Sequence, residues 1–206
     1  MTRHMTLPVI VAISGSLHAG SSVECALAVS LNAARSAGAC VELVCGSELD
    51  LPKADPGSAP RTSQAERLLK LISEADGLLL GTPACQGTVS RRMTNALDYV
   101  EGLRTARRPY FTGRAIGCLA VGKGRQETVS ALMALRTVVH ALRGWPTPLG
   151  VAVDAEGTSV APGGGFTDAE VNRQLALMGR QVVEFACMTR ALAAATHPAG
   201  SRVRSW

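Results

Sequence analysis

The stretch Val-Ile-Val-Ala-Ile-Ser-Gly-Ser-Leu-His-Ala-Gly-Ser-Ser, residues 9–22, decides the fold of this chain. It begins as a short run of β-formers and continues as a loop of small, hydroxyl-bearing residues that opens a helix at about Val23. A buried parallel strand followed by such a loop brings free backbone N–H groups and the positive end of a helix to one point. The stretch therefore predicts an anion site, with the hydroxyls of Ser16, Ser21 and Ser22 as further donors.

The same loop argues against two common kinds of phosphate site. No Gly-Lys-Ser/Thr follows, so the loop has neither the lysine for a triphosphate nor the hydroxyl for Mg²⁺. It also lacks the Gly-x-Gly-x-x-Gly spacing that binds a dinucleotide's pyrophosphate. A terminal monophosphate is the ligand that remains, and the alternative is an ordinary turn rich in small residues.

The composition is that of one globular domain. The chain has 206 residues, of which 47% are hydrophobic, enough for a full core. No apolar run approaches the length of about 18 residues that spans a membrane, and the N-terminus lacks a signal peptide's apolar segment. We therefore expect a cytoplasmic protein that does not contact the membrane.

The spacing of the cysteines and the charge of the chain indicate which kinds of ligand it binds. The six cysteines form no Cys-x-x-Cys pair and do not cluster with the four histidines, which favours reduced thiols over disulfides or a metal site. The net charge of +5 comes without basic runs interleaved with aromatic residues, which favours small anionic ligands over nucleic acid.

Strand-like and helix-like segments alternate along the chain. The predicted strands are residues 9–13, 40–45, 77–81, 115–121 and 148–153, and the predicted helices are about 23–37, 63–75, 92–103, 127–142 and 168–194. This alternation predicts an α/β fold with a doubly wound five-stranded parallel sheet that has helices on both faces. We expect a single domain over residues 1–196, a surface loop at 47–62, and a disordered tail at 197–206. Thr167 and Glu170 predict a capping box at the last helix.

Three loops of unusual chemistry follow predicted strands. They are the serine loop, Gly-Thr-Pro-Ala-Cys-Gln-Gly-Thr-Val-Ser at 81–90, and Gly-Lys-Gly-Arg-Gln at 122–126. Because ligands of such sheets bind beyond the carboxyl ends of the strands, the three loops should converge on one crevice.

These motifs, in this order, resemble those of the NADPH-dependent FMN reductase family, whose fold is flavodoxin-like. The family's Gly-Ser-x-Arg-x-x-Ser-x-Asn is matched at Gly15, Ser16 and Ser21. Its Thr-Pro-x-Tyr-Asn-Gly-Ser, followed by Leu-Lys-Asn-x-x-Asp, is matched at Thr82, Pro83, Gly87, Asn95 and Asp98. The glycine-rich loop and the following Leu135-Arg136 look like the family's third motif. The resemblance runs from Val9 to about Val153.

The resemblance implies FMN and NADPH as cofactors. The cofactor contacts that it implies come from Ser16, His18, Ser21, Ser22, Pro83, Ala84, Cys85, Gln86, Gly87, Gly122, Lys123 and Gly124. It also implies that Asn95 and Asp98 brace the neighbouring loop rather than react. Lys123, Arg91 and Arg92 either meet the phosphates of NADPH or are solvated surface charges.

Three departures from the family pattern bear on FMN binding. His18 replaces an arginine and Val23 an asparagine, and a charged hydrogen bond of that kind is worth roughly 1.5–3 kcal/mol. Cys85 replaces a tyrosine beside the ring, so it is either a reactive thiol or a small side chain that enlarges the substrate pocket. These changes weaken FMN binding without abolishing it, because backbone amides and three hydroxyls remain.

The resemblance implies an oxidoreductase that passes hydride from NADPH to FMN. The electrons then go to a small-molecule quinone, azo, nitro or metal-oxyanion acceptor, or leave with reduced flavin. The flavin carries the chemistry, and no catalytic side chain or metal is expected. One alternative is an electron carrier, although such carriers are usually acidic. The other is a member that has lost FMN and acts as a binding or partner protein.

Apolar positions on two predicted helices suggest self-association. Helix 127–142 carries Leu132, Leu135, Val139 and Leu142 on one stripe, which covering the sheet would explain. Met133, Ala134 and Ala141 widen this apolar surface further, and helix 92–103 likewise carries Met93, Ala96, Leu97 and Val100. Because related flavin reductases pair these helices, we expect a homodimer, or a tetramer built from it, whose second subunit helps to wall the substrate pocket.

Overall fold

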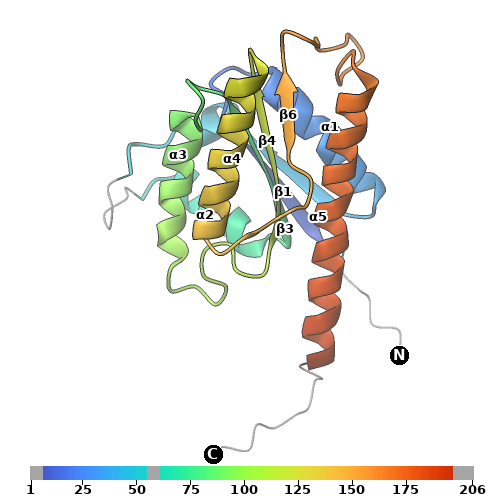
Figure 1. Cartoon of the computed structure of the whole chain (residues 1–206). Coiled ribbons are helices and arrows are strands. Elements are labelled where there is room, and N and C mark those ends of the chain that lie inside the picture. The colour runs from blue at the N-terminus through green and yellow to red at the C-terminus, as the bar shows by residue number, and fades with distance from the viewer. Residues whose placement is uncertain (1–6, 55–60, 197–206) are drawn as a thin grey trace, which may run out of the picture.

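A computed structural model describes residues 7–54 and 61–196, and within them six strands form one parallel sheet (Figure 1). The strands are β1 (Val9–Ser14), β2 (Cys40–Val44), β3 (Gly77–Pro83), β4 (Ala115–Gly122), β5 (Trp145–Pro146) and β6 (Val151–Asp154). Their order is β2-β1-β3-β4, and both β5 and β6 pair with the far side of β4. The predicted parallel sheet is confirmed.

The sheet differs from the prediction at the fifth strand, which is expected at 148–153. Along β4, Trp145 pairs with Ala115 near one end and Val151 pairs with Leu119 further on, so two short strands share one edge. Pro146 and Pro148 lie in or beside the gap and have no N–H to donate to a ladder. The sheet therefore has the five predicted strand positions, but two short strands, β5 and β6, share the last of them.

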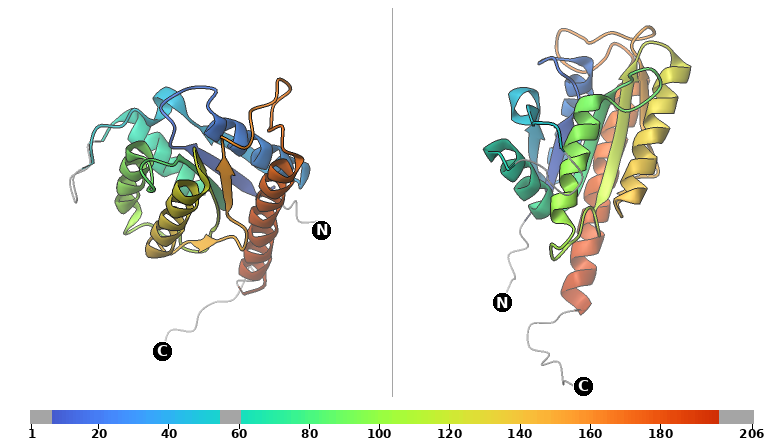
Figure 2. Two further views of the ribbon diagram at one scale, coloured as in Figure 1. Left: turned by 45° about the horizontal axis from the view of Figure 1, so that its top comes forward. Right: turned by 90° about the vertical axis from the view of Figure 1, so that its left-hand side faces the viewer.

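Helices cover both faces of the sheet (Figure 2). On one face lie α1 (Ser22–Ser36) and α5 (Ala169–Thr196), and on the other lie α2 (Ser63–Glu74), α3 (Arg91–Asp98) and α4 (Arg125–Ala141). Two 3₁₀ turns, η1 (Gly46–Leu49) and η2 (Tyr99–Leu103), follow β2 and α3. The predicted helix 92–103 is thus an α-helix only as far as Asp98. No helix among the described residues is long and apolar enough to cross a membrane.

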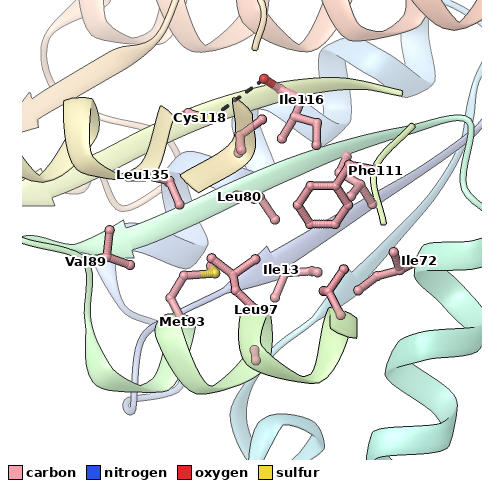
Figure 3. Packing of buried hydrophobic residues seen from close by; sticks show 14 of the residues in the cluster. Ile13, Ile72, Leu80, Val89, Met93, Leu97, Phe111, Ile116, Cys118 and Leu135 are labelled. Atoms are coloured by element: carbon pink, nitrogen blue, oxygen red, sulfur yellow. Dashed lines mark hydrogen bonds between the residues drawn. The ribbon is translucent and has the colours of Figure 1, made fainter. Parts of the chain in front are cut away.

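The apolar stripes of α3 and α4 face the sheet. Leu80 and Phe111 pack with Met93, Leu97 and Leu135 in the core between the sheet and these helices (Figure 3). Ala96, Val100, Leu132 and Val139 are buried in the same core. Covering the sheet therefore accounts for these stripes, and the pairing of subunits through the two helices stays a prediction. On the outer side of α4, Val129 and Met133 remain exposed.

The predicted capping box at α5 does not form. The helix begins at Ala169, and the Oδ1 of Asp168 accepts the N–H of Glu170. Thr167 Oγ1 instead accepts the N–H of Ser159 and lies 3.1 Å from Thr158 Oγ1, so it belongs to the preceding loop. The predicted tail at 197–206 and residues 55–60 of the predicted loop lie outside the described residues.

The amino end of the sheet is closed by a buried arginine. Arg114, at the start of β4, has no exposed surface. Its guanidinium donates to the carbonyl oxygens of Ala75 at 3.0 Å, Tyr110 at 3.1 Å and Ser73 at 2.7 Å. Burial, and then the charge of Arg108, lowers the pKa of Arg114 to about 10, partly offset by Asp76. The arginine thus ties the end of α2 to the loop before β4.

Candidate functional site

A cleft of about 430 Å³ lies at the carboxyl end of the sheet. Four strand ends contribute to it: the loops after β1, β3 and β4, and the residue after β6. Its walls are formed by Ser16, Ser21, Ser22, Val23, Pro83, Ala84, Val121, Gly122, Lys123, Glu127 and Ala155. The crevice expected from the strand-end rule is therefore present.

The loop after β1 is held in place at its base. The N–H of Gly15 donates to the carbonyl of Gly81 on β3 at 2.7 Å, and the hydroxyl of Ser90 donates to the carbonyl of Gly15 at 2.8 Å. Ser90 in turn receives support from Thr82, whose Oγ1 accepts its N–H at 2.9 Å. A Cβ on Gly15 would lie 2.8 Å from Met93 Cβ, so only glycine allows this close approach. The loop base is thereby fixed to β3 and to the start of α3.

Beyond that base, the loop leaves hydrogen-bond donors open. Ser16 Oγ accepts the N–H of His18, and Ser21 Oγ caps α1 by accepting the N–H of Glu24. Within the described residues, five loop N–H groups have no protein acceptor, those of Leu17, Ala19, Ser21, Ser22 and Val23. Free N–H groups at the start of a helix are the ordinary binding site of an anion.

The loop after β3 forms the second wall. Ala84 is tied to β4 because its N–H donates to the carbonyl of Val121 at 2.7 Å. Cys85 and Thr88 then close a tight turn through two backbone bonds of 3.0 and 3.1 Å. The central residues, Gln86 and Gly87, have φ of 55° and 74°, as a type I′ hairpin turn requires.

The loop after β4 forms the third wall. Gly122 comes so close to its neighbours that a Cβ there would lie 2.6 Å from Ala84 Cβ and 2.7 Å from Thr128 Oγ1. Gly124, with φ of 92°, is held through its N–H by the carboxylate of Asp154 at the end of β6, at 3.1 Å. Lys123 lies between these glycines, exposed, on the cleft wall.

Seven of the twelve residues assigned to cofactor binding lie on the cleft wall: Ser16, Ser21, Ser22, Pro83, Ala84, Gly122 and Lys123. The other five, His18, Cys85, Gln86, Gly87 and Gly124, belong to the same loops but not to the wall. His18 is exposed on the first loop, and Cys85 and Gln86 are exposed on the tight turn. Which of them touch a flavin stays a prediction.

Sequence reasoning missed four wall residues: Val23, Val121, Glu127 and Ala155. Ala155 comes directly after Asp154, so applying the strand-end rule to the last predicted strand would have found it. Glu127 is in the first turn of α4, and its carboxylate accepts the N–H of Gly87 at a long 3.4 Å. Only the folded chain shows that this helix start lies opposite the β3 loop.

The polar residues of α3 serve the neighbouring loop. Asn95 Oδ1 accepts the N–H of Ala54, and its amide donates to the carbonyls of Leu51 and Pro52, so the loop that it braces is the one after η1 and not the loop 81–90. Asp98 makes no such bond among the described residues; burial raises the pKa of its carboxyl group. Arg92 is ion-paired with Asp50 and donates to the Gly46 carbonyl, whereas Arg91 is exposed.

The cleft suits a flavin mononucleotide. At one end it offers hydroxyls and open N–H groups to a phosphate, and further along Pro83, Ala84 and Val121 offer apolar surface to a planar ring. Its volume lies within the range of about 300–1,000 Å³ usual for small-molecule sites. No group of three or more possible metal-binding side chains occurs among residues 7–54 and 61–196.

Comparison with known proteins decides the family. A family model described as NADPH-dependent FMN reductase matches residues 8–158. The chain belongs to this family. As an FMN reductase family member it is an NAD(P)H-dependent flavin oxidoreductase, and the resemblance seen in the sequence is confirmed.

Solved structures agree on the fold of this FMN reductase family member. The flavoenzyme NAD(P)H:(acceptor) oxidoreductase FerB from Paracoccus denitrificans is similar with a TM-score of 0.71 and 19% identity, over 89% of this chain and 99% of that one. The apo form of the NADH:FMN oxidoreductase EmoB has a TM-score of 0.64 and 19% identity, over 88% and 89%. A flavodoxin, WrbA-like protein from Agrobacterium tumefaciens has a TM-score of 0.62 and 13% identity, over 89% and 99%. The flavodoxin-like fold is therefore confirmed. No curated protein matches the chain.

Proposed function

We propose that this oxidoreductase binds FMN in the cleft and uses NADPH to reduce it. The phosphate occupies the loop 16–22, and the ring lies along the segment 83–87 opposite Gly122. The observation that carries this proposal is the set of open N–H groups at the start of α1, beside the apolar wall of Pro83 and Ala84. A phosphate at that point satisfies donors that otherwise have no protein acceptor.

The chain's own part is to bind, orient and shield. Ser21 and Ser22 present hydroxyls and N–H groups to the phosphate, and Ala84 is fixed by its bond to β4. Gly122 keeps the opposite wall close, and Lys123 offers a positive charge to a phosphate of NADPH at the cleft mouth. When bound, FMN supplies the redox chemistry, taking hydride from the nicotinamide and passing two electrons to a quinone, azo, nitro or metal-oxyanion acceptor or leaving as reduced flavin.

Flavin titration tests this proposal. The purified chain should quench FMN fluorescence on binding and should oxidise NADPH once FMN is added. The double variant Ser16→Ala, Ser21→Ala should bind FMN at least about tenfold more weakly, because two hydrogen bonds to a charged group are lost. Ser36→Ala, an exposed serine at the other end of α1, is the matched control and should bind as the natural chain does.

Each contrary result favours a different function. A chain that binds neither FMN nor riboflavin has lost its flavin and acts through another ligand or partner. A chain that binds FMN but oxidises neither NADPH nor NADH is an electron carrier. Unchanged FMN affinity in the double serine variant would overturn the phosphate assignment.

We also propose that the chain forms a homodimer through the outer side of α4. Val129 and Met133 lie one helical turn apart there and are 41% and 56% exposed. Light scattering at micromolar concentration should give twice the chain mass, and Met133→Glu should reduce it to the monomer mass. A monomeric natural chain would contradict the dimer and the shared substrate pocket.

We place the protein in the cytoplasm. The spacing of its six cysteines pairs none of them in a recognisable motif, as expected of thiols in a reducing compartment. Fractionation of the producing cells checks this, and recovery of the protein outside the cytoplasm would contradict it.

A further inference from the structure

A carboxylate of α1 folds back onto the phosphate loop. Glu24 Oε2 accepts the N–H of Gly20 at 2.8 Å, while the N–H of Glu24 donates to Ser21 Oγ at 3.3 Å. The arrangement is a variant of the capping box, in which the acid three residues after the cap returns to an N–H ahead of the helix. A negative charge also stabilises the helix N-terminus, so Glu24 supports α1 in the absence of a ligand.

The same carboxylate occupies a backbone N–H group that could otherwise bind a phosphate. Gly20 lies in the middle of the loop 16–22, between the open N–H groups of Ala19 and Ser21. Its own N–H is taken by Glu24 and is no longer free for an anion. A second negative charge beside the loop also repels a phosphate, since like charges at short range oppose each other.

Glu24 lacks a cationic partner in the part of the chain that the structure describes. Within the described residues it forms no salt bridge, and its Oε1 is shielded from solvent without a conventional hydrogen-bond partner. Its neighbour is the thiol of Cys45, whose pKa is raised by burial and then by the charge and hydrogen bond of Glu24. The carboxylate therefore lies beside the phosphate loop with no cation paired to it in the described part of the chain.

We propose that Glu24 competes with the 5′-phosphate of FMN for this loop and keeps the flavin exchangeable. This inference rests on the proposed FMN function. Glu24 acts on the phosphate end alone, so it sets how strongly the chain prefers FMN over riboflavin, which has the same ring and ribityl chain without the phosphate. Removing the charge of this α1 carboxylate thus strengthens FMN binding.

The test compares FMN with riboflavin. Dissociation constants of both are measured by flavin fluorescence for the full chain and for Glu24→Gln, which keeps the shape and hydrogen-bonding oxygen but removes the charge. Glu24→Gln should bind FMN about three- to tenfold more tightly and riboflavin unchanged. Glu66→Gln is the matched control, because Glu66 is an exposed acid in the first turn of α2, remote from the phosphate loop, and it should change neither constant.

The outcomes separate the inference from the function beneath it. FMN affinity that is unchanged or weaker in Glu24→Gln, or an equal gain for riboflavin, overturns the competition while leaving FMN binding intact. If the natural chain binds neither flavin, the proposed function itself is contradicted. Glu24→Ala gives the same reading should Glu24→Gln not fold, as judged by circular dichroism.

Discussion

The two ends of the sheet differ in whether their hydrogen-bond donors have acceptors within the protein. At the amino end, each of the three guanidinium nitrogens of the buried Arg114 donates to a carbonyl oxygen of the protein itself. At the carboxyl end, the loop 16–22 leaves N–H groups open within the described residues, and glycines bring the walls of a cleft close together. The difference separates stability from binding, so substitutions at the two ends should affect different measurements.

Arg114→Met should have the largest effect, and on stability alone. It removes the guanidinium that donates to the carbonyls of Tyr110 and Ser73 and shares the carbonyl of Ala75 with Arg108, which should cost about 3–5 kcal/mol of unfolding free energy. Urea unfolding measures the loss, and FMN affinity at a temperature where the variant is folded should not change. Arg107→Met, which removes an exposed arginine of the same loop, is the control. A loss below about 1 kcal/mol would contradict the role of Arg114.

Gly122→Ala should affect both measurements. Its Cβ would lie 2.6 Å from Ala84 Cβ, so the cleft wall must move. Overpacking of this kind costs about 1–3 kcal/mol, and the displaced wall should weaken FMN binding as well. Gly163→Ala is the control, because no atom lies within 4 Å of the added carbon. Equal effects of the two substitutions would mean that the close approach at Gly122 is not needed.

Cys85→Tyr should have the smallest effect, on binding alone. Cys85 is exposed at the start of the tight turn after Ala84, where an aromatic ring could stack on a flavin. Stacking adds roughly 0.5–1.5 kcal/mol, so FMN binding should tighten by up to about tenfold and the flavin spectrum should change. Cys187→Tyr, at an exposed cysteine of α5, should alter neither. Identical titrations for the two variants would place the ring elsewhere.

Much of the fold could be predicted from the sequence because it depends on short-range patterns. The buried β-runs give β1, β3 and β4, and the helical spacings give the five helices within a few residues. What failed depends on contacts between distant segments. The stripe of Leu135 and Val139 on α4 is legible in the sequence, but the exposure of Val129 and Met133 on its outer side shows only in the folded chain. The spacing of Thr167 predicts a helix cap, but in the folded chain its hydroxyl oxygen accepts the N–H of Ser159 instead.

The candidate site divides in the same way. Ser16, Ser21, Pro83 and Gly122 lie at the carboxyl ends of strands or in the loops that follow them, so the strand-end rule predicts them. Glu127 reaches the cleft from a helix start, and its position opposite Gly87 has no local signature. The Ser-x-x-Glu spacing of Ser21 and Glu24 is legible in the sequence, but its bond to Gly20 within the phosphate loop is not.

The most direct test of the proposed cofactor site is a crystal structure of the chain with FMN. We predict the phosphate oxygens at hydrogen-bond distance, about 3 Å, from the N–H groups of Ser21 and Ser22, with the ring against Pro83 and Ala84. A phosphate bound away from the loop 16–22, or a ring more than about 10 Å from the segment 83–87 and so well beyond contact, would contradict it.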